Sequence, residues 1–382
     1  MTAKRIDNIR PFYVMDLLAR ARELQAQGRE VIHLEVGEPD FTTPQPVIDA
    51  GRRALVDGKI HYTPALGLPE LREALSRWYA TRFGVDVPAG RIVITPGSST
   101  GLQMLMSALV DPGSKVLLPD PGYPCNRNFV YLCDAEPVSL AVNAENHWIP
   151  TPREIADSWD SATSLMMVAS PANPTGAVLS QSQLEALVQQ IKTLGGYLIV
   201  DEIYQGLSYE SAPATALEFD ADHLFVVNGF SKYFGMTGWR LGWLVVPESF
   251  VPIMDKLAQN LYLSAPTISQ YAALEALKPE SVSILEQRRD TFRQRRDYLY
   301  PQLKQLGFKL SPPQGAFYLY ADCSDLCDDS FSFCHQLLEE QGVAVTPGRD
   351  FGNNRPQQHL RFAYTTTIEK MQKAVERIAE FL

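Results

Sequence analysis

The chain has 382 residues, of which 45% are hydrophobic, 20% charged and 10% aromatic, a mix typical of a globular protein with a large buried core. Its 24 glycines and 27 prolines are close to average usage, which excludes collagen-like and low-complexity chains. Because a net charge of −10 would repel a phosphate backbone, we expect no nucleic-acid partner.

The first two thirds of the chain alternate between strand-like and helix-like patterns. We expect a helix over 13–27, followed by an extended segment over 31–37. The expected strands, short apolar runs bounded by Gly, Pro or Asp, are 91–95, 115–118, 164–169, 196–201, 223–228 and 241–246. Helical patterns such as 101–110 and 180–194 lie between them. This order predicts an α/β domain with a largely parallel sheet, whose ligands lie at the carboxyl ends of the strands.

After residue 250 the pattern changes to long helices, clearest over 281–306. The elements expected next are an extended segment at 316–323, a helix at 330–341, a strand at 342–348, an extended segment at 359–364 and a terminal helix at 368–382. We therefore expect three parts: an N-terminal arm (1–44) docked on the small domain, a large domain (45–279) and a small α+β domain (280–382). The helix near 290 carries acids among a cluster of arginines, which we interpret as a solvated helix face. These arginines are Arg288, Arg289, Arg293, Arg295 and Arg296.

The cysteines and the hydropathy pattern point to a cytoplasmic protein. Cysteine occurs at five positions, an odd and sparse set that argues against a disulfide framework and fits no common zinc module, so we expect no metal. These positions are Cys125, Cys133, Cys323, Cys327 and Cys334. No apolar run reaches the ~18 residues of a membrane helix, and the first ten residues lack the apolar stretch of a signal peptide, so we expect no membrane association.

The segment ITPGSSTGLQML (94–105) predicts a strand, a Gly/Ser turn and a helix. Amides and hydroxyls around Ser98 and Ser99 would meet an anion at the positive end of the helix dipole. Helix capping by the same residues explains the pattern equally well without a ligand.

A hydrolase is an alternative for the same turn. The letters at 97–101 spell G-x-S-x-G, the nucleophile elbow of α/β hydrolases, with Ser99 as the nucleophile. Asp201 together with His335 or His359 would complete a triad in the required chain order.

Polar residues follow three further apolar strands. Asn173 lies in SPANPTG (170–176), and Asp201 ends the strand GYLIVD with Tyr204 three residues later. Lys232 has mostly aromatic neighbours, so desolvation would lower its pKa, and a neutral amine there can form a Schiff base. Arg240, eight residues on, is placed to pair with an anion near this lysine.

Eight motifs in order give the chain, from about Val31 to its C-terminus, a resemblance to a known family. The motifs are GEPDF (37–41), HYTPALGLPELREAL (61–75), PGSSTGL (96–102), DPGYP (120–124), SPANPTG (170–176), DEIY (201–204), SKxxxMxGxRxG (231–242) and HLRFAY (359–364). In them the chain resembles the class I and II aminotransferases, pyridoxal-phosphate enzymes of fold type I, and particularly their bacterial aspartate-type subgroup. The resemblance implies a fold-type I structure and an aminotransferase that moves an amino group to a 2-oxo acid in ping-pong half-reactions.

The resemblance also implies roles at the cofactor, pyridoxal 5′-phosphate. Lys232 matches the lysine that forms the internal aldimine and shuttles the proton at the substrate α-carbon. Asp201 matches the carboxylate that keeps the pyridine nitrogen protonated, while Asn173 and Tyr204 match the pair that hydrogen-bonds the phenolate oxygen. Tyr123 falls where the family has an aromatic ring against the cofactor face. The positions that match phosphate contacts are Ser98, Ser99, Ser231 and Arg240.

Substrate and partner contacts are implied in the same way. Arg361 matches the arginine that grips the substrate α-carboxylate, Gly37 matches the backbone that closes over the substrate, and Asn173 is placed beside it. Tyr62 resembles the tyrosine that reaches the phosphate of the neighbouring subunit, so a homodimer with shared active sites is implied.

Two departures from the family pattern bear on the substrate. Gly229 stands where many relatives have a phosphate-binding serine, and Ser99 stands where aspartate-type members have a lysine that reads the distal carboxylate. With apolar and aromatic cover from residues 11–13, we expect uncharged donors such as alanine, methionine or an aromatic amino acid to exceed aspartate, with 2-oxoglutarate as the acceptor. A carbon-sulfur β-lyase remains the alternative, because Lys232 and Asp201 serve any carbanion chemistry.

Overall fold

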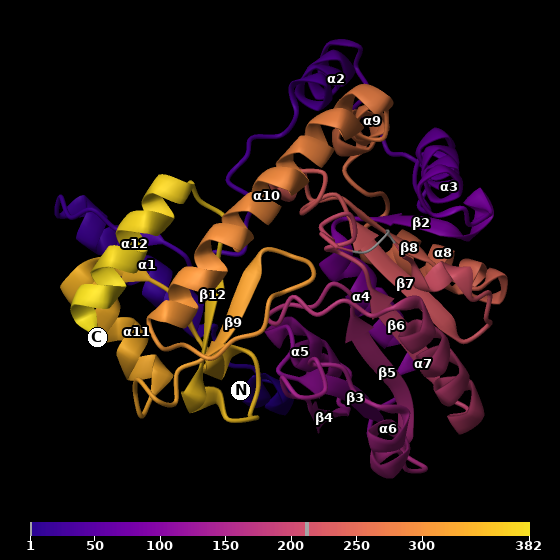
Figure 1. Ribbon diagram of the computed structural model, residues 1–382. Helices are drawn as coiled ribbons and strands as arrows, with labels where there is room; N and C mark the ends of the chain where they lie inside the picture. Colours follow the sequence, from indigo (N-terminus) through magenta and orange to yellow (C-terminus); the bar gives the residue numbers. More distant parts are fainter. Residues whose placement is uncertain (1, 211–213) are drawn as a thin grey trace.

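The computed structural model describes residues 2–210 and 214–382 and is built around a seven-stranded sheet (Figure 1). The strands are β2 (Ile92–Thr95), β3 (Lys115–Asp120), β4 (Glu136–Ala141), β5 (Thr163–Ala169), β6 (Tyr197–Asp201), β7 (Leu224–Gly229) and β8 (Gly242–Val245). Their order in the sheet is β2-β8-β7-β6-β5-β3-β4, and only β8 runs against its neighbours. The predicted mostly parallel sheet is therefore confirmed.

Both faces of this sheet are buried under helices. Met166 and Val168 of β5 point into one apolar cluster, and Leu165 and Met167 point into the other, which is why the strand is continuously apolar from Leu165 to Ala169 and does not alternate. The helices of this part are α2 (Gln45–Val56), α3 (Pro69–Phe83), α4 (Ser98–Leu109), α5 (Pro124–Leu132), α6 (Pro152–Ser158), α7 (Gln181–Leu194), α8 (Val251–Leu261) and α9 (Thr267–Ala276).

Local sequence signals delimit α7, which precedes the strand that carries Asp201. Ser180 accepts a hydrogen bond from the backbone N–H of Gln183 and forms a capping box with that residue, and Gly195 ends the helix in the left-handed conformation at φ 71°. The chain then enters β6 at once, so Asp201 lies at the carboxyl end of a central strand.

A second, smaller sheet is antiparallel, in the order β11-β12-β9, and a separate pair joins β1 to β10. The strands of this part of the molecule are β1 (Ile32–His33), β9 (Tyr318–Asp322), β10 (Val343–Ala344), β11 (Thr346–Pro347) and β12 (His359–Ala363), and its helices are α1 (Tyr13–Ala26), α10 (Pro279–Gln305), α11 (Ser330–Gln341) and α12 (Ile368–Phe381). The strand expected over 342–348 is divided, because β10 pairs with β1 while β11 pairs with β12. In Figure 1, α10 runs from α9 toward this smaller sheet.

The interpretation of the α10 arginines as a solvated face is wrong for two of them. Arg295 and Arg296 are only 5% and 7% exposed. Arg295 donates both terminal nitrogens to Asp40 at 2.7 and 2.8 Å, and Arg296 pairs with Glu210 at 2.6 Å. Charge spacing along one helix does not reveal that segments distant in sequence cover it.

Within the described ranges, no three or more His, Cys, Asp or Glu side chains are grouped to hold a metal ion, and the cysteines are free thiols. In the same part of the chain, no helix has both the length and the apolarity needed to cross a bilayer.

Candidate active site

One cavity lies where the carboxyl ends of the central strands meet the smaller sheet and α1. Eleven of the twelve residues predicted for the site line it: Gly37, Ser98, Ser99, Tyr123, Asn173, Asp201, Tyr204, Ser231, Lys232, Arg240 and Arg361. Tyr62 does not, and its side chain is exposed. The cavity therefore unites residues at or just after the carboxyl ends of five strands of the large sheet, β2, β3, β5, β6 and β7, with others from the smaller sheet.

Lys232 brings a buried amine to this cavity. Its Nζ donates to the carbonyl oxygen of Gly37 at 2.7 Å and lies 5.9 Å from the centre of the Tyr204 ring. Burial lowers the pKa of Lys232 to about 8, with a smaller opposing effect from Glu38, so a substantial fraction of the amine is neutral near pH 8. A neutral amine is the form that attacks a carbonyl carbon.

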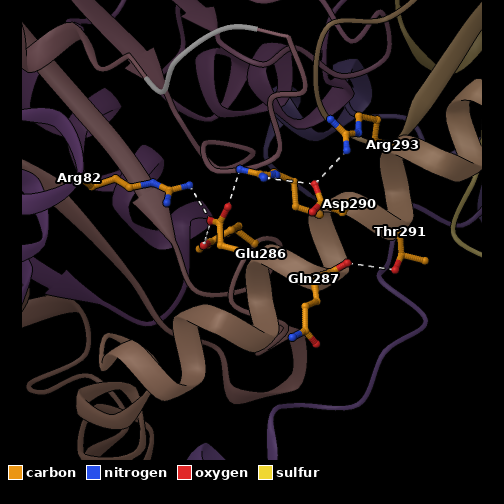
Figure 2. A network of polar contacts seen from close by, with 8 residues as sticks. Arg82, Glu286, Gln287, Asp290, Thr291 and Arg293 are labelled. Atoms are coloured by element: carbon orange, nitrogen blue, oxygen red, sulfur yellow. Dashed lines mark hydrogen bonds and ion pairs between the residues drawn. The ribbon is translucent and has the colours of Figure 1, made fainter.

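The backbone beside Lys232 is fixed from the side of α10. Tyr233 donates its hydroxyl hydrogen to Glu286, and Arg82 donates to the same carboxylate oxygen at 2.7 Å. Figure 2 shows Arg82 reaching Glu286, with Asp290 and Arg293 paired further along the helix. The lysine thus lies next to a residue held by α3 and α10 together.

An acid and two phenols line the same cavity as the amine. Asp201 is 5% exposed, its Oδ1 accepts a hydrogen bond from the N–H of Ile203 at 3.0 Å, and burial raises its pKa to about 7. A cationic nitrogen beside it would stabilise the carboxylate form. The hydroxyls of Tyr204 and Tyr318 are 2.7 Å apart, and burial raises the pKa of both, so each remains a neutral phenol able to donate a hydrogen bond.

The start of α4 forms a cradle for an anion. Gly97 has φ 80°, and a Cβ there would lie 2.8 Å from the Nη2 atom of Arg240. A Cβ on Gly242 would lie 2.6 Å from the backbone nitrogen of Ser98. Only glycines allow this approach, which brings a guanidinium to the free N–H groups and partial positive charge of a helix N-terminus. A phosphate group suits this combination.

Arg361 presents a second, preoriented cation. It is 6% exposed, donates through Nη1 to Asn173 Oδ1 at 3.0 Å and through Nη2 to the carbonyl oxygen of Glu35 at 2.6 Å. Its guanidinium lies 4.3 Å from the ring centre of Tyr318 and 4.9 Å from that of Phe351. Its Nε is buried and has no partner within the described residues. A planar group held in this way is suited to a carboxylate.

Several residues that line the cavity lie outside the motifs, so they were not predicted from the sequence. They are Val14, Met15 and Leu18 of α1 and Tyr318, Thr346, Asp350 and Phe351 of the C-terminal part. The cover expected from residues 11–13 is only partly right: Phe12 lines the cavity, but the ring of Tyr13 packs against Phe331 at 5.3 Å and Pro11 lies outside the lining. The reason is that α1 begins at Tyr13, so its helical spacing turns positions 14, 15 and 18 toward the cavity.

The hydrolase hypothesis is wrong, because in the part of the chain that the structure describes neither of its two candidate histidines lies at Ser99. His359 is buried and stacked on Tyr320 at 4.8 Å, and His335 packs against Phe331 at 4.6 Å. Neither histidine lines the cavity that holds Ser99.

The residues present fit pyridoxal phosphate. The fit rests on a buried amine with a lowered pKa at Lys232, a buried acid at Asp201, and the cradle between Arg240 and the start of α4. When bound, this cofactor supplies a ring that withdraws electrons from the carbon carrying the amino group. In such a site Lys232 would hold the cofactor and carry a proton at Nζ, and Asp201 would hold a proton at the ring nitrogen.

Comparisons with known proteins agree with this chemistry. A family model described as aminotransferase class I and II matches residues 29–378. The chain is 38% identical over 384 residues to a (5-formylfuran-3-yl)methyl phosphate transaminase of Methanocaldococcus jannaschii, covering 100% of both chains. It is 38% identical over 374 residues to the valine–pyruvate aminotransferase of Mycobacterium tuberculosis, covering 97% of this chain and 96% of the relative. The solved structure of Thermus thermophilus aspartate aminotransferase with maleate has a TM-score of 0.95 and 36% identity, covering 100% of both chains.

Proposed function

This chain belongs to the class I and II aminotransferases, pyridoxal-phosphate-dependent enzymes of fold type I, and we propose that it transfers the amino group of an uncharged L-amino acid to a 2-oxo acid. The substrate is the open question within the family, since relatives of similar identity are named for valine, for aspartate and for an aldehyde phosphate.

The observation that carries this proposal is the number of cations in the cavity. Among the described lining residues they are Lys232, Arg240 and Arg361. If Lys232 and Arg240 hold the cofactor, Arg361 alone remains, which suffices for one carboxylate. A second substrate carboxylate, buried in this cavity without a cation beside it, is destabilised by several kcal/mol. Asp350, which also lines the cavity, would repel it further. Ser99, on the first turn of α4, offers only a hydroxyl.

Individual roles are proposed on the same geometry. Lys232 holds the cofactor and moves the proton, and Asp201 faces its ring nitrogen. Asn173 donates to its ring oxygen through its side-chain amide, and Tyr204 donates there through its hydroxyl while Tyr318 supplies the hydrogen of the bond that the two phenols share. Tyr123 packs on the ring. Phosphate contacts are assigned to Ser98, Ser99, Ser231 and Arg240, and substrate contacts to Gly37, Asn173 and Arg361.

We also propose a homodimer in which Tyr62 reaches the partner's site. Support comes from exposed apolar side chains at Leu55, Val56, Ile60 and Tyr62, which are 55%, 86%, 62% and 79% exposed. Such a cluster is typical of an interface. Sedimentation of the wild type and of Val56→Asp tests it: a monomeric wild type would contradict the proposal.

The division into an arm (1–44), a large domain (45–279) and a small domain (280–382) also remains a proposal. The pairing of β1 with β10 supports docking of the arm on the small domain.

A side-by-side measurement of kcat/KM tests the substrate class. Holoenzyme is first given alanine, methionine, phenylalanine or aspartate alone, and the loss of cofactor absorbance in the first half-reaction is followed. Addition of 2-oxoglutarate or pyruvate then measures the second half-reaction. We expect the neutral donors to exceed aspartate. Aspartate exceeding every neutral donor tenfold would show that another residue reads the distal carboxylate. A separate incubation with L-cysteine, which carries sulfur on its β-carbon, tests the alternative: release of ammonia, sulfide and pyruvate would indicate β-lyase chemistry instead.

A further inference from the structure

The wall of the cavity opposite the strand ends is formed by the N-terminal arm. Val14, Met15 and Leu18, all apolar, line the cavity, and Leu18 lies on the same face of α1 as the other two because it follows Val14 by four residues and Met15 by three. The other face of the same helix buries Leu17, Ala21 and Leu24. The position of this apolar wall therefore depends on how firmly the start of α1 is held.

The first turn of α1 is held by a carboxylate from far along the chain. The residue before the helix is Phe12, whose side chain has no hydrogen-bond acceptor and makes no capping bond. Asp350 takes that place: its Oδ1 accepts a hydrogen bond from the N–H of Tyr13 and its Oδ2 from the N–H of Val14, both at 2.8 Å. Asp350 is 5% exposed, so these bonds form away from water, at the positive end of the helix dipole.

The loop that carries Asp350 is itself fixed to the large sheet and to the carboxylate site. Arg127 of α5 donates to the carbonyl oxygen of Asp350, and the N–H of Gly122 donates to the carbonyl oxygen of Phe351, both at 2.8 Å. The Phe351 ring lies 4.9 Å from the guanidinium of Arg361. One short loop thus joins the arm to the residue proposed to read the α-carboxylate.

From this arrangement we propose that Asp350 is a positioning residue for donor selectivity: by capping α1 it holds Val14, Met15 and Leu18 as the surface against which an apolar donor side chain packs. The identity of the donor rests on the proposed function. The anchoring of α1 rests only on the hydrogen bonds from the N–H groups of Tyr13 and Val14 to Asp350. Asp350 takes no part in proton transfer. Its loss should therefore raise KM for a donor with a long apolar side chain and leave kcat largely intact.

Asp350→Ala tests the anchor without any turnover. Losing a helix cap weakens a helix start by about five- to thirty-fold, so amide hydrogen exchange of a peptide covering residues 10–20 should accelerate by about that factor in the holoenzyme. Asp350→Asn, which keeps one acceptor oxygen, should show a smaller acceleration and serves if the alanine variant folds poorly. Ser180→Ala removes the cap of α7, far from the arm, and should leave exchange at residues 10–20 unchanged.

Kinetics with the same variants test the selectivity. The ratio of kcat/KM for methionine to that for alanine should fall in Asp350→Ala, fall less in Asp350→Asn and stay unchanged in Ser180→Ala. The fall should come from a higher KM for methionine. Unchanged exchange in Asp350→Ala would overturn the anchor, and equal losses for methionine and alanine would overturn the role in selectivity. If the wild type accepts neither amino acid, the proposed function fails. The anchor can still be tested in that case, because the exchange measurement does not depend on turnover.

Discussion

Replacing Arg361 by lysine keeps the positive charge of the proposed carboxylate site but removes the planar guanidinium group. Arginine holds two terminal nitrogens in one plane, donating to Asn173 at 3.0 Å and to the carbonyl oxygen of Glu35 at 2.6 Å, between the rings of Tyr318 and Phe351. A lysine has a single nitrogen at its end and cannot serve both partners and a substrate carboxylate in a bidentate way. We therefore expect Arg361→Lys to weaken substrate binding.

The expected size follows from the hydrogen bonds lost. A hydrogen bond to a charged group contributes about 1.5 to 3 kcal/mol, so loss of one of two such bonds to the carboxylate lowers kcat/KM by about 10- to 150-fold at 1.4 kcal/mol per factor of ten. Amino acid and 2-oxo acid share the α-carboxylate, so the loss should be similar for both half-reactions. It should be expressed mainly in KM.

The assay is steady-state kinetics of both half-reactions in wild type, Arg361→Lys and Arg91→Lys. Arg91 is a matched control: it donates to the carbonyl oxygen of Val246 at 2.9 Å, pairs with Asp220 at 3.0 Å and does not line the cavity. Its substitution should leave kcat/KM unchanged. A wild-type KM in Arg361→Lys, or an equal rise in Arg91→Lys, would refute the assignment.

Three further predictions concern the cofactor. Borohydride reduction of the holoenzyme and peptide mapping should find the pyridoxyl label on Lys232, and a label on another lysine would contradict its role. The rate at which cofactor-free protein takes up pyridoxal phosphate should rise with pH and level off above about 8. The reason is that burial lowers the pKa of Lys232 to about 8, and only its neutral form attacks an aldehyde. A rate independent of pH would count against Lys232 as the attacking amine. Asp201→Ala should keep the circular dichroism of the fold and lower turnover by about 10² to 10⁴, with Ser99→Ala much milder; the opposite ranking would disprove the assignment.

The sequence alone determined the sheet and most of the chemistry at its edge. Apolar runs bounded by Gly, Pro and Asp are local signals, and the carboxyl ends of parallel strands meet at one edge. Asn173, Asp201 and Lys232, each just after or at the end of such a run, were therefore predictable as neighbours. The ordered motifs then indicated the family, which the comparisons confirm.

Tertiary structure decided what surrounds these groups. Asp350 and Tyr13 are 337 positions apart, and neither lies in a motif that marks the pairing. The hydroxyl of Tyr318 occupies the place that a Cβ on residue 37 would need, so Gly37 allows this contact. Arg295 is buried against Asp40, although the charge pattern of its helix is typical of a solvated face. Local patterns record which side of an element is apolar, but long-range hydrogen bonds and buried ion pairs depend on which distant segments pack together, and only the folded chain specifies that.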